Sequence, residues 1–231
     1  MRSKETSMIS ESEQICGRYQ QLYAGVIYDV LEHLGYPHQV LAHDISPLIP
    51  DMKLAGPAFT IKGTMSCERN EAGRYKRLEM IRRMQRPCVE VRDCGTPHAI
   101  AMYGELSATT AAAHGAVGAL VDGGTRDTAR LISMGFPVFA RYRTPIEAFG
   151  RWVMLDCQVP VLLSGELTDT VQVNPGDFIF GDYDGVLVIP QDLTLKVLID
   201  CERITGIENQ ARAAFARGED PVEVFQRYKR L

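Results

Sequence analysis

The segment from residue 88 to residue 140 alternates between short apolar runs and helix-forming stretches, and this alternation restricts the fold more than any other feature. In chain order the pattern predicts a strand at 88–92, a helix at 104–114, a strand at 117–121, a helix at 126–134 and a strand at 137–140. Gly115 and Gly135 end the two helices. Strands and helices that alternate at this spacing form a parallel β-α-β-α-β unit with right-handed crossovers.

The regions that flank this unit predict further strands and three more helices. Before it we expect an amphipathic helix at 15–34, a strand at 54–62 and a basic helix within 69–86. After it we expect short strands at 152–155, 159–163, 171–173, 178–180 and 186–189, and then a long helix at 192–217. The fold class is therefore α/β, with one domain over residues 15–218. Residues 1–14 and 219–231 are expected to be polar tails.

Length and composition are those of one globular domain. The chain has 231 residues, of which 45% are hydrophobic, and it contains no apolar run long enough to cross a bilayer. Its polar start carries no secretory signal, so we expect a cytoplasmic protein. The net charge of −4 argues against a nucleic-acid partner. We interpret the six arginines and one lysine of residues 69–86 as the solvated face of an amphipathic helix rather than as a patch for RNA or another anionic partner.

Polar residues follow two of the predicted strands. One loop leads to Gly104 and Glu105 at the start of a helix, and the other leads to Arg126 and Asp127. Ligands bind beyond the carboxyl ends of the strands in open α/β sheets, so we expect Glu105, Arg126 and Asp127 to converge on one crevice. The free backbone N–H groups from Gly104 to Ser107 are a predicted cradle for a carboxylate. The Arg-Asp pair has a simpler interpretation as a helix cap with a surface ion pair.

This set of residues suits chemistry on a 2-oxo acid. A hard cation such as Mg²⁺ takes one or two carboxylates together with waters and substrate oxygens. Asp127 is the candidate for a direct metal ligand, and Glu105 or Asp122 for a carboxylate that holds a coordinated water. Chelation by a substrate's carboxylate and keto oxygen would polarise the carbonyl. The guanidinium of Arg126 would stabilise the enolate oxygen as its charge develops.

Four sequence blocks, in the same order, resemble the pattern of one family. They are AGVIYDVLEHL (24–34), LAGPAFTI (54–61), GELSATTAAAHGAVGALVDGGTRD (104–127) and VNPGDFIFGDYDGVLVIP (173–190). The third block has an acidic residue, twenty intervening residues and Arg-Asp. The chain thereby resembles the family of the class II 4-hydroxy-4-methyl-2-oxoglutarate aldolases. That family also contains the regulator of ribonuclease activity A and proteins mislabelled as dimethylmenaquinone methyltransferases.

The resemblance implies a swivelling β/β/α-type domain, assembled as a homotrimer or as a dimer of trimers (a homohexamer) with active sites between subunits. In the aldolases the counterpart of Asp127 ligates Mg²⁺ or Mn²⁺, and that of Arg126 contacts the pyruvyl group. The counterpart of Glu105 orients a metal-bound water for proton transfer. Backbone amides near Gly104 and Leu106 hold the substrate carboxylate.

Other positions complete or depart from the family pattern. A neighbouring subunit is expected to contribute a glutamate from its C-terminal region, and Glu202 and Glu208 are the candidates. The acidic position is Glu105 where aspartate is common in the aldolases, so the carboxylate reaches one methylene further. Arg130 stands where some members carry an acid.

The residues and the resemblance together predict a metal-dependent lyase. We expect retro-aldol cleavage of a 4-hydroxy-2-oxo acid to pyruvate, and oxaloacetate decarboxylation through the same enolate. The alternative is a non-enzymatic regulator that binds a ribonuclease, as in the other branch of the family. Schiff-base chemistry is disfavoured because Lys62 is the only strand lysine suited to it, and methyl transfer because no GxGxxG motif occurs.

Overall fold

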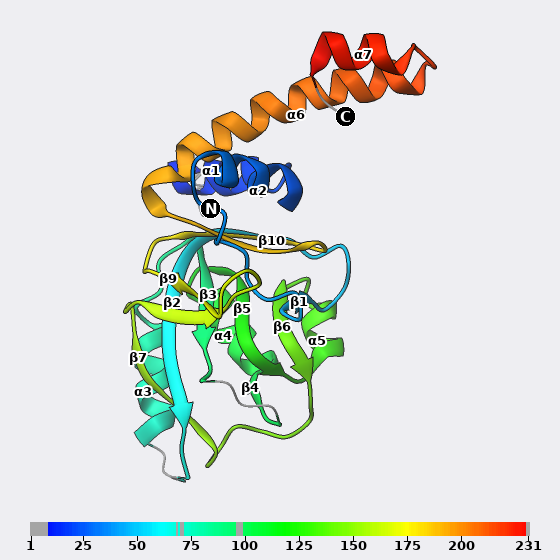
Figure 1. Cartoon of the computed structure of the whole chain (residues 1–231). Helices are drawn as coiled ribbons and strands as arrows, with labels where there is room; N and C mark the ends of the chain where they lie inside the picture. The colour runs from blue at the N-terminus through cyan, green and yellow to red at the C-terminus, as the bar shows by residue number, and fades with distance from the viewer. Residues whose placement is uncertain (1–8, 68, 70–71, 96–98, 230–231) are drawn as a thin grey trace, which may run out of the picture.

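The computed structural model describes residues 9–67, 69, 72–95 and 99–229, and a sheet of nine strands lies at its centre (Figure 1). The strands are β1 (Ser46–Pro47), β2 (Leu54–Met65), β3 (Cys88–Asp93), β4 (Ala101–Tyr103), β5 (Ala116–Thr125), β6 (Val138–Arg143), β7 (Trp152–Cys157), β8 (Val161–Ser164), β9 (Thr170–Val173), β10 (Phe178–Asp182) and β11 (Gly185–Ile189). The order in the sheet is β1-β6-β5-β3-β2-β10-β11, with β4 beside β5 and β7 beside β2. Strands β8 and β9 form a separate antiparallel hairpin.

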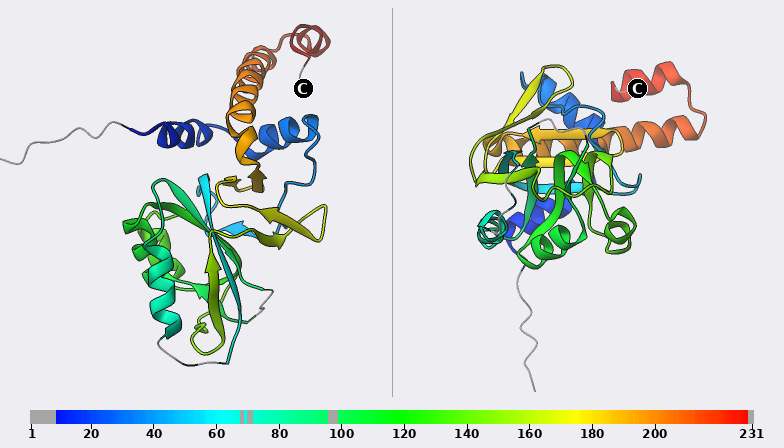
Figure 2. Two further views of the ribbon diagram at one scale, coloured as in Figure 1. Left: turned by 90° about the vertical axis from the view of Figure 1, so that its left-hand side faces the viewer. Right: turned by 90° about the horizontal axis from the view of Figure 1, so that it is seen from below.

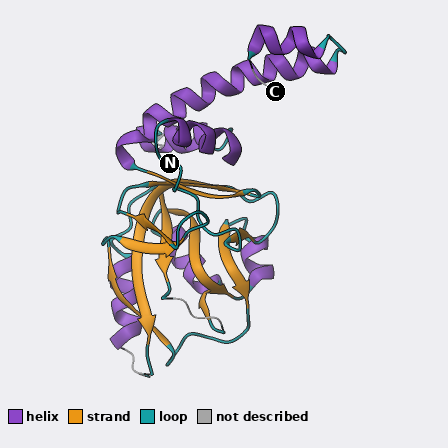
Figure 3. Cartoon of the chain, in the orientation of Figure 1, coloured by secondary structure: helices purple, strands orange, loops and turns teal. Residues whose placement is uncertain are grey.

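The helices lie on one face of the sheet and beyond one of its ends. They are α1 (Glu11–Tyr19), α2 (Ala24–His33), α3 (Ala72–Ile81), α4 (Glu105–Ala113), α5 (Thr128–Ser133), α6 (Thr194–Ala216) and α7 (Pro221–Tyr228), with a 3₁₀ turn at Gln191–Leu193. Helices α3, α4 and α5 lie on one side of the sheet (Figure 2). Helices α1, α2 and α6 lie beyond its end, where they pack over β10 and β11 (Figure 3).

The predicted parallel unit is confirmed. Strands β3, β5 and β6 are parallel neighbours, α4 lies between β3 and β5 in the chain, and α5 lies between β5 and β6. Strand β2 adds a further parallel partner to β3, whereas β7 and β10 pair with β2 in the antiparallel sense. The result is the expected mixed α/β domain, in which β4 and β5 end side by side and their carboxyl ends lead directly into α4 and α5.

The expected single helix at 15–34 is wrong, because the chain bends between α1 and α2. At the bend Lys53 Nζ donates a hydrogen bond to the Leu22 carbonyl at 2.8 Å, and the Asp182 carboxylate accepts the Ala24 N–H at 2.8 Å. These distant side chains satisfy the carbonyl and amide groups that a helix break exposes. The apolar periodicity of residues 15–34 does not indicate these hydrogen bonds, because Lys53 and Asp182 lie elsewhere in the chain.

Other boundaries also differ from the sequence-based expectations. Helix α5 begins at Thr128, two residues later than predicted, and β4 lies within a segment expected to be a loop. Helix α1 begins inside the expected N-terminal tail, whose first eight residues lie outside the described part of the chain. The expected C-terminal tail contains α7, which Asp220 caps by accepting the N–H groups of Val222 and Glu223. In the part of the chain that the structure describes, no helix is long and apolar enough to span a membrane.

Candidate active site

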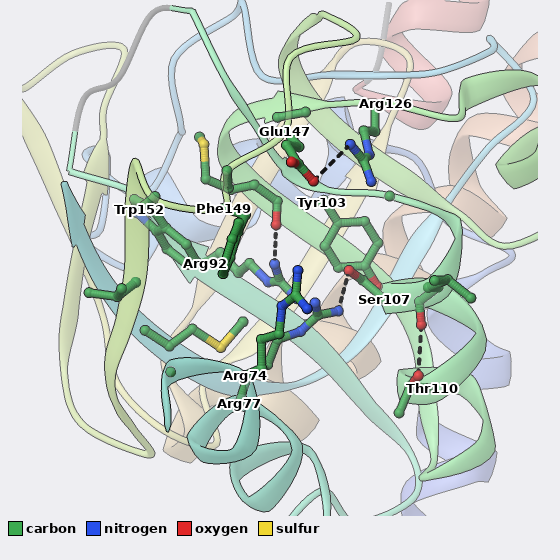
Figure 4. A pocket seen from close by; sticks show the side chains of 18 of the residues that line it. Arg74, Arg77, Arg92, Tyr103, Ser107, Thr110, Arg126, Glu147, Phe149 and Trp152 are labelled. Carbon is green, nitrogen blue, oxygen red and sulfur yellow. Dashed lines mark hydrogen bonds and ion pairs between the residues drawn. The ribbon is translucent and has the colours of Figure 1, made fainter. Parts of the chain in front are cut away.

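A cleft of about 590 Å³ opens between α3, the start of α4 and the segment that leads into β7 (Figure 4). Arginines and aromatic rings are prominent in its walls. The charged and aromatic residues that line it are Arg74, Arg77, Arg92, Tyr103, Arg126, Asp127, Glu147, Phe149 and Trp152. Four guanidiniums and two carboxylates therefore face one cavity, which makes it suitable for an anionic ligand.

Arg126 and Asp127 follow the end of β5 and lie where α4 begins. The Arg126 N–H donates to the Tyr103 carbonyl at 3.0 Å, which ties the end of β5 to the end of β4. Asp127 has a φ of 57°, a left-handed conformation that aspartate tolerates better than most residues. Its Oδ2 atom accepts the Glu105 N–H at 3.2 Å and lies 3.5 Å from Arg126 Nε. The Asp127 carboxylate thus caps α4 and pairs with Arg126, while about 40% of its surface stays exposed.

Gly104 permits this close approach of two chain segments. A β-carbon at that position would lie 2.7 Å from Asp127 Oδ2 and 3.2 Å from Arg126 Cγ. Its φ of −167° is ordinary extended backbone, so the need for glycine comes from space and not from backbone conformation. Any larger residue would displace the carboxylate from the start of α4.

The expected cradle of backbone amides at the start of α4 is already partly used. The Glu105 N–H bonds to Asp127, and the Ser107 N–H bonds to the Gly104 carbonyl at 3.0 Å. The Leu106 N–H lies in the same first turn, where amides have no intrahelical acceptor, and Leu106 lines the cleft. The Glu105 carboxylate accepts the hydroxyl of Thr109 at 2.9 Å and is not part of the cleft wall.

Asp122, a candidate for water-mediated metal binding, lies away from the cleft. Its carboxylate is nearly buried and bonds to the Arg141 guanidinium of β6, and it also accepts the Ser164 N–H of β8 at 2.7 Å. Successive side chains of a strand point to opposite faces of the sheet, and that of Asp122 points towards β6 and β8. Its contacts with Arg141 and Ser164 connect β5, β6 and β8, and Asp122 does not line the cleft.

Glu202 and Glu208 lie on α6, at the opposite end of the molecule from the cleft (Figure 1). Glu202 forms a bidentate ion pair with Arg18 of α1, at 2.6 and 2.8 Å. Glu208 accepts the hydroxyl of Tyr23. Within one chain neither glutamate approaches Arg126, so only a second copy of the chain could bring one of them to the site.

The floor of the cleft is a buried charged network that the sequence pattern did not reveal. Arg92 donates to Glu90 Oε1 from both Nε and Nη2, at 2.8 and 2.6 Å, and both side chains are essentially inaccessible. Tyr103 donates its hydroxyl to Glu90 at 3.2 Å, and its ring lies against the Arg92 guanidinium. Burial, with the nearby charge of Glu90, raises the pKa of Tyr103 well above its usual value, so the phenol stays protonated and donates. Glu90 and Arg92 are two residues apart in a strand, so their side chains lie on the same face of the sheet. This spacing of opposite charges is the sequence feature from which the pair could have been predicted.

The donor atoms in the cleft fit a hard divalent cation. Asp127 offers one partly exposed carboxylate, and within the described residues its Oδ1 atom accepts no hydrogen bond. A Mg²⁺ ion is typically held by one or two carboxylates, with waters and substrate oxygens in the remaining positions. The described residues contain no cluster of three or more His, Cys, Asp or Glu side chains suited to a metal. The Asp127 carboxylate could therefore serve such an ion only with waters and substrate oxygens completing the coordination.

Curated relatives are similar to most of the chain. The chain is 30% identical over 211 residues to protein DlpA of Legionella pneumophila. This alignment covers 90% of the chain and 33% of DlpA, so the chain spans about a third of the length of that relative. It is also 30% identical over 161 residues to a protein of Halalkalibacterium halodurans named "Putative 4-hydroxy-4-methyl-2-oxoglutarate aldolase", covering 68% of this chain and 70% of the relative.

Solved structures share the fold. One described as a novel cellulase from microbes associated with the gut ecosystem is 32% identical, with a TM-score of 0.79 and 91% of both chains covered. Streptomyces coelicolor RraAS2, described as an unusual member of the RNase ES inhibitor RraA family, is 21% identical, with a TM-score of 0.74. That alignment covers 87% of this chain and 97% of RraAS2. The model of the RraA-like family, described as Aldolase/RraA, matches residues 24–188. Since this match spans most of the chain, the chain belongs to the RraA-like family, which includes both aldolases and inhibitors of ribonucleases.

Proposed function

We propose that this chain is a divalent-metal-dependent lyase that cleaves a 4-hydroxy-2-oxo acid to pyruvate and a second carbonyl compound. The same site would decarboxylate oxaloacetate. The observation that carries the proposal is the position of Arg126 and Asp127. Both face an arginine-lined cleft beside the first turn of α4, so a cation ligand, a guanidinium and a backbone amide are available to one small 2-oxo acid.

Each residue of the site has a role in the proposed reaction. The Leu106 N–H at the positive end of α4 binds the substrate carboxylate. A base takes the proton from the C4 hydroxyl, the C3–C4 bond breaks, and its electron pair moves to the C2 oxygen as an enolate. Arg126 stabilises this oxygen as its negative charge grows. Protonation at C3 by water then gives pyruvate; to orient that water, the Glu105 carboxylate, which accepts from Thr109 outside the cleft wall, would have to turn towards the cleft.

Asp127 is the residue that would hold the cation directly, and Glu105 would act only through a bound water. A bound Mg²⁺ or Mn²⁺ would supply Lewis-acid polarisation of the 2-oxo group. We also propose a homotrimer or a dimer of trimers, in which Glu202 or Glu208 of a neighbouring copy reaches the cleft. The exposure of the Asp127 carboxylate agrees with a site that a second chain completes.

Removal of the metal is expected to stop catalysis. Pyruvate release from 4-hydroxy-2-oxoglutarate, followed with a coupled dehydrogenase, should fall to background with a chelator, because the keto oxygen loses its Lewis acid. Excess Mg²⁺ or Mn²⁺ should restore the rate, and thermal melting should show that the chelated protein stays folded. Equal rates with metal and with chelator would exclude the metal mechanism.

Replacement of Gly104 by alanine should lower activity without unfolding the protein. The added β-carbon meets the end of the Asp127 side chain at 2.7 Å, and this carboxylate moves more easily than backbone does. We expect kcat/KM for pyruvate formation to fall roughly tenfold or more, because a displacement of about 1 Å is enough to impair a catalytic group. The melting temperature should change little. Gly17→Ala is the control, because a β-carbon there has no atom within 4 Å; equal kcat/KM values in the two variants would contradict the role of Gly104.

Two other activities are less well supported. A ribonuclease-binding regulator, as in the inhibitor branch of the family, requires no Arg-Asp pair beside a helix start. Capture of a ribonuclease without any 2-oxo acid turnover would favour it. Polysaccharide hydrolysis, suggested by the cellulase description of one structural relative, involves a neutral substrate. The cleft instead contains Arg74 and Arg77, which form no ion pair among the described residues and favour an anion.

A further inference from the structure

The α3 side of the cleft carries positive charge beyond what the proposed 2-oxo acid site uses. Arg74, Arg77 and Arg92 converge there, on the wall away from Arg126 (Figure 4). Arg92 is neutralised by Glu90. Among the described residues, neither Arg74 nor Arg77 forms an ion pair with a carboxylate. Two guanidiniums therefore line the cavity without an ion pair among the described residues, and the Glu90 carboxylate that acts on Arg77 is already bound to Arg92.

Arg77 is held so that it points into this part of the cleft. Its Nη2 atom donates to the hydroxyl oxygen of Ser107, a nearly buried residue of α4. Its Nε atom is buried and has no hydrogen-bond acceptor in the described part of the chain. Burial, together with the charge of Arg92, lowers the pKa of Arg77 to about 10, so the guanidinium remains charged at neutral pH. A charged group with a buried, unbonded donor is unfavourable, so an anion close to this guanidinium would lower its free energy.

Arg74 lies next to it in a more open position. Its guanidinium carbon is 4.2 Å from the centre of the Phe149 ring, which holds the group over the cleft. Arg74 and Arg77 are three residues apart on α3, so their side chains leave the helix on the same face. Two guanidinium forks side by side match the oxygens of a carboxylate or a phosphate.

We propose that Arg74, Arg77 and Ser107 form a second anion subsite, which selects substrates carrying a carboxylate or phosphate on the fragment released as the second carbonyl compound. Because Arg77 donates to the Ser107 oxygen, the hydroxyl proton of Ser107 is available to the ligand. The placement of this anion across the cleft from Arg126 rests on the proposed lyase function, but the anion subsite itself does not.

The kinetic test compares three substrates of the same reaction. They are 4-hydroxy-2-oxopentanoate with an uncharged tail, 4-hydroxy-2-oxoglutarate with a carboxylate tail and 4,5-dihydroxy-2-oxohexanoate 6-phosphate with a phosphate tail. Wild-type kcat/KM should be higher for the substrates with a charged tail than for the one with an uncharged tail. Whichever charged substrate has the higher kcat/KM shows whether the subsite prefers a carboxylate or a phosphate. Arg77→Met should lower kcat/KM for that substrate roughly tenfold to a hundredfold, the range for a hydrogen bond to a charged group. The loss for 4-hydroxy-2-oxopentanoate should be much smaller, because this substrate has no charged tail for Arg77 to bind and the contacts at Arg126 are unchanged.

Control variants separate the subsite from general effects of charge and folding. Arg82→Gln removes an exposed arginine just after the end of α3 and should change none of the three kcat/KM values. Arg74→Gln acts on the more exposed member of the pair, so it keeps the test available if Arg77→Met does not fold. The subsite is disproved if every variant treats charged and uncharged tails alike.

Equilibrium binding distinguishes failure of the subsite from failure of the lyase proposal. Titration calorimetry of the full chain with inorganic phosphate and with glutarate needs no turnover. One of these anions should bind to the wild type and to Arg126→Ala, and its affinity should fall at least about tenfold in Arg77→Met. Such a result without turnover of any substrate would support the subsite and reject the lyase. Absence of binding by both anions to the wild type would overturn the subsite.

Discussion

Replacement of Asp127 by asparagine is expected to reduce metal-dependent pyruvate formation by roughly a thousandfold or more. Asparagine tolerates the left-handed backbone conformation at this position, where φ is 57°. Its amide oxygen is able to accept the Glu105 N–H, so the cap of α4 is kept. What the change removes is the negative charge that, in the proposed mechanism, would hold the cation. Loss of several kcal/mol of transition-state stabilisation corresponds to a rate effect on the order of a thousandfold.

The measurement is kcat/KM over a range of Mg²⁺ and Mn²⁺ concentrations, together with direct metal binding by calorimetry. Both the affinity for metal and the rate should fall in Asp127→Asn, while the melting temperature changes little. Asp169→Asn, in the exposed turn between β8 and β9, is the matched control and should behave as wild type. Wild-type turnover in Asp127→Asn would remove Asp127 from the proposed metal site.

Replacement of Arg126 by alanine should cost about 3 kcal/mol or more of transition-state stabilisation, or a rate loss of roughly a hundredfold. The guanidinium lies 3.5 Å from the Asp127 carboxylate and 3.9 Å from that of Glu147, and more than a third of the Arg126 side chain is exposed. Its proposed partner is the enolate oxygen, which carries full negative charge only after the C3–C4 bond breaks. The loss should therefore fall mainly on kcat.

Steady-state kinetics with 4-hydroxy-2-oxoglutarate would measure this effect. Arg126→Lys should recover part of kcat, because an ammonium keeps the charge and loses the planar fork. Arg130→Ala removes an exposed arginine one turn later, on α5, and serves as the control. An effect confined to KM in Arg126→Ala would indicate that Arg126 binds the ground state and has no special role in the enolate step.

The arrangement of Arg126 and Asp127 beside α4 follows from features that a sequence displays well. Apolar runs and glycine-ended helices define β-α units, and parallel strands place the loops that follow them at one edge of the sheet. In the structure the Glu105 N–H is hydrogen-bonded to Asp127, as expected for two loops at the same edge of the sheet. It does not bring Asp122 there, because the pleat turns that side chain towards Arg141 and Ser164.

The remaining differences come from contacts between residues far apart in the chain. The break between α1 and α2 depends on Lys53 and Asp182, which no local periodicity represents. The basic run was interpreted as a solvated helix face, yet Arg74 and Arg77 line the cleft. The packing position of an amphipathic helix decides which of its arginines face solvent and which face a cavity.

The hydrogen bond between Asp127 and the start of α4 has a consequence for ligand affinity. A surface aspartate ordinarily samples several rotamers, and a cation that captures it must oppose that loss of freedom. Here the Glu105 amide and Arg126 already restrict the carboxylate, so the entropy of ordering it is lost when the chain folds. An incoming ion would therefore meet a preorganised oxygen, and tight capture would need fewer protein ligands than a flexible site requires.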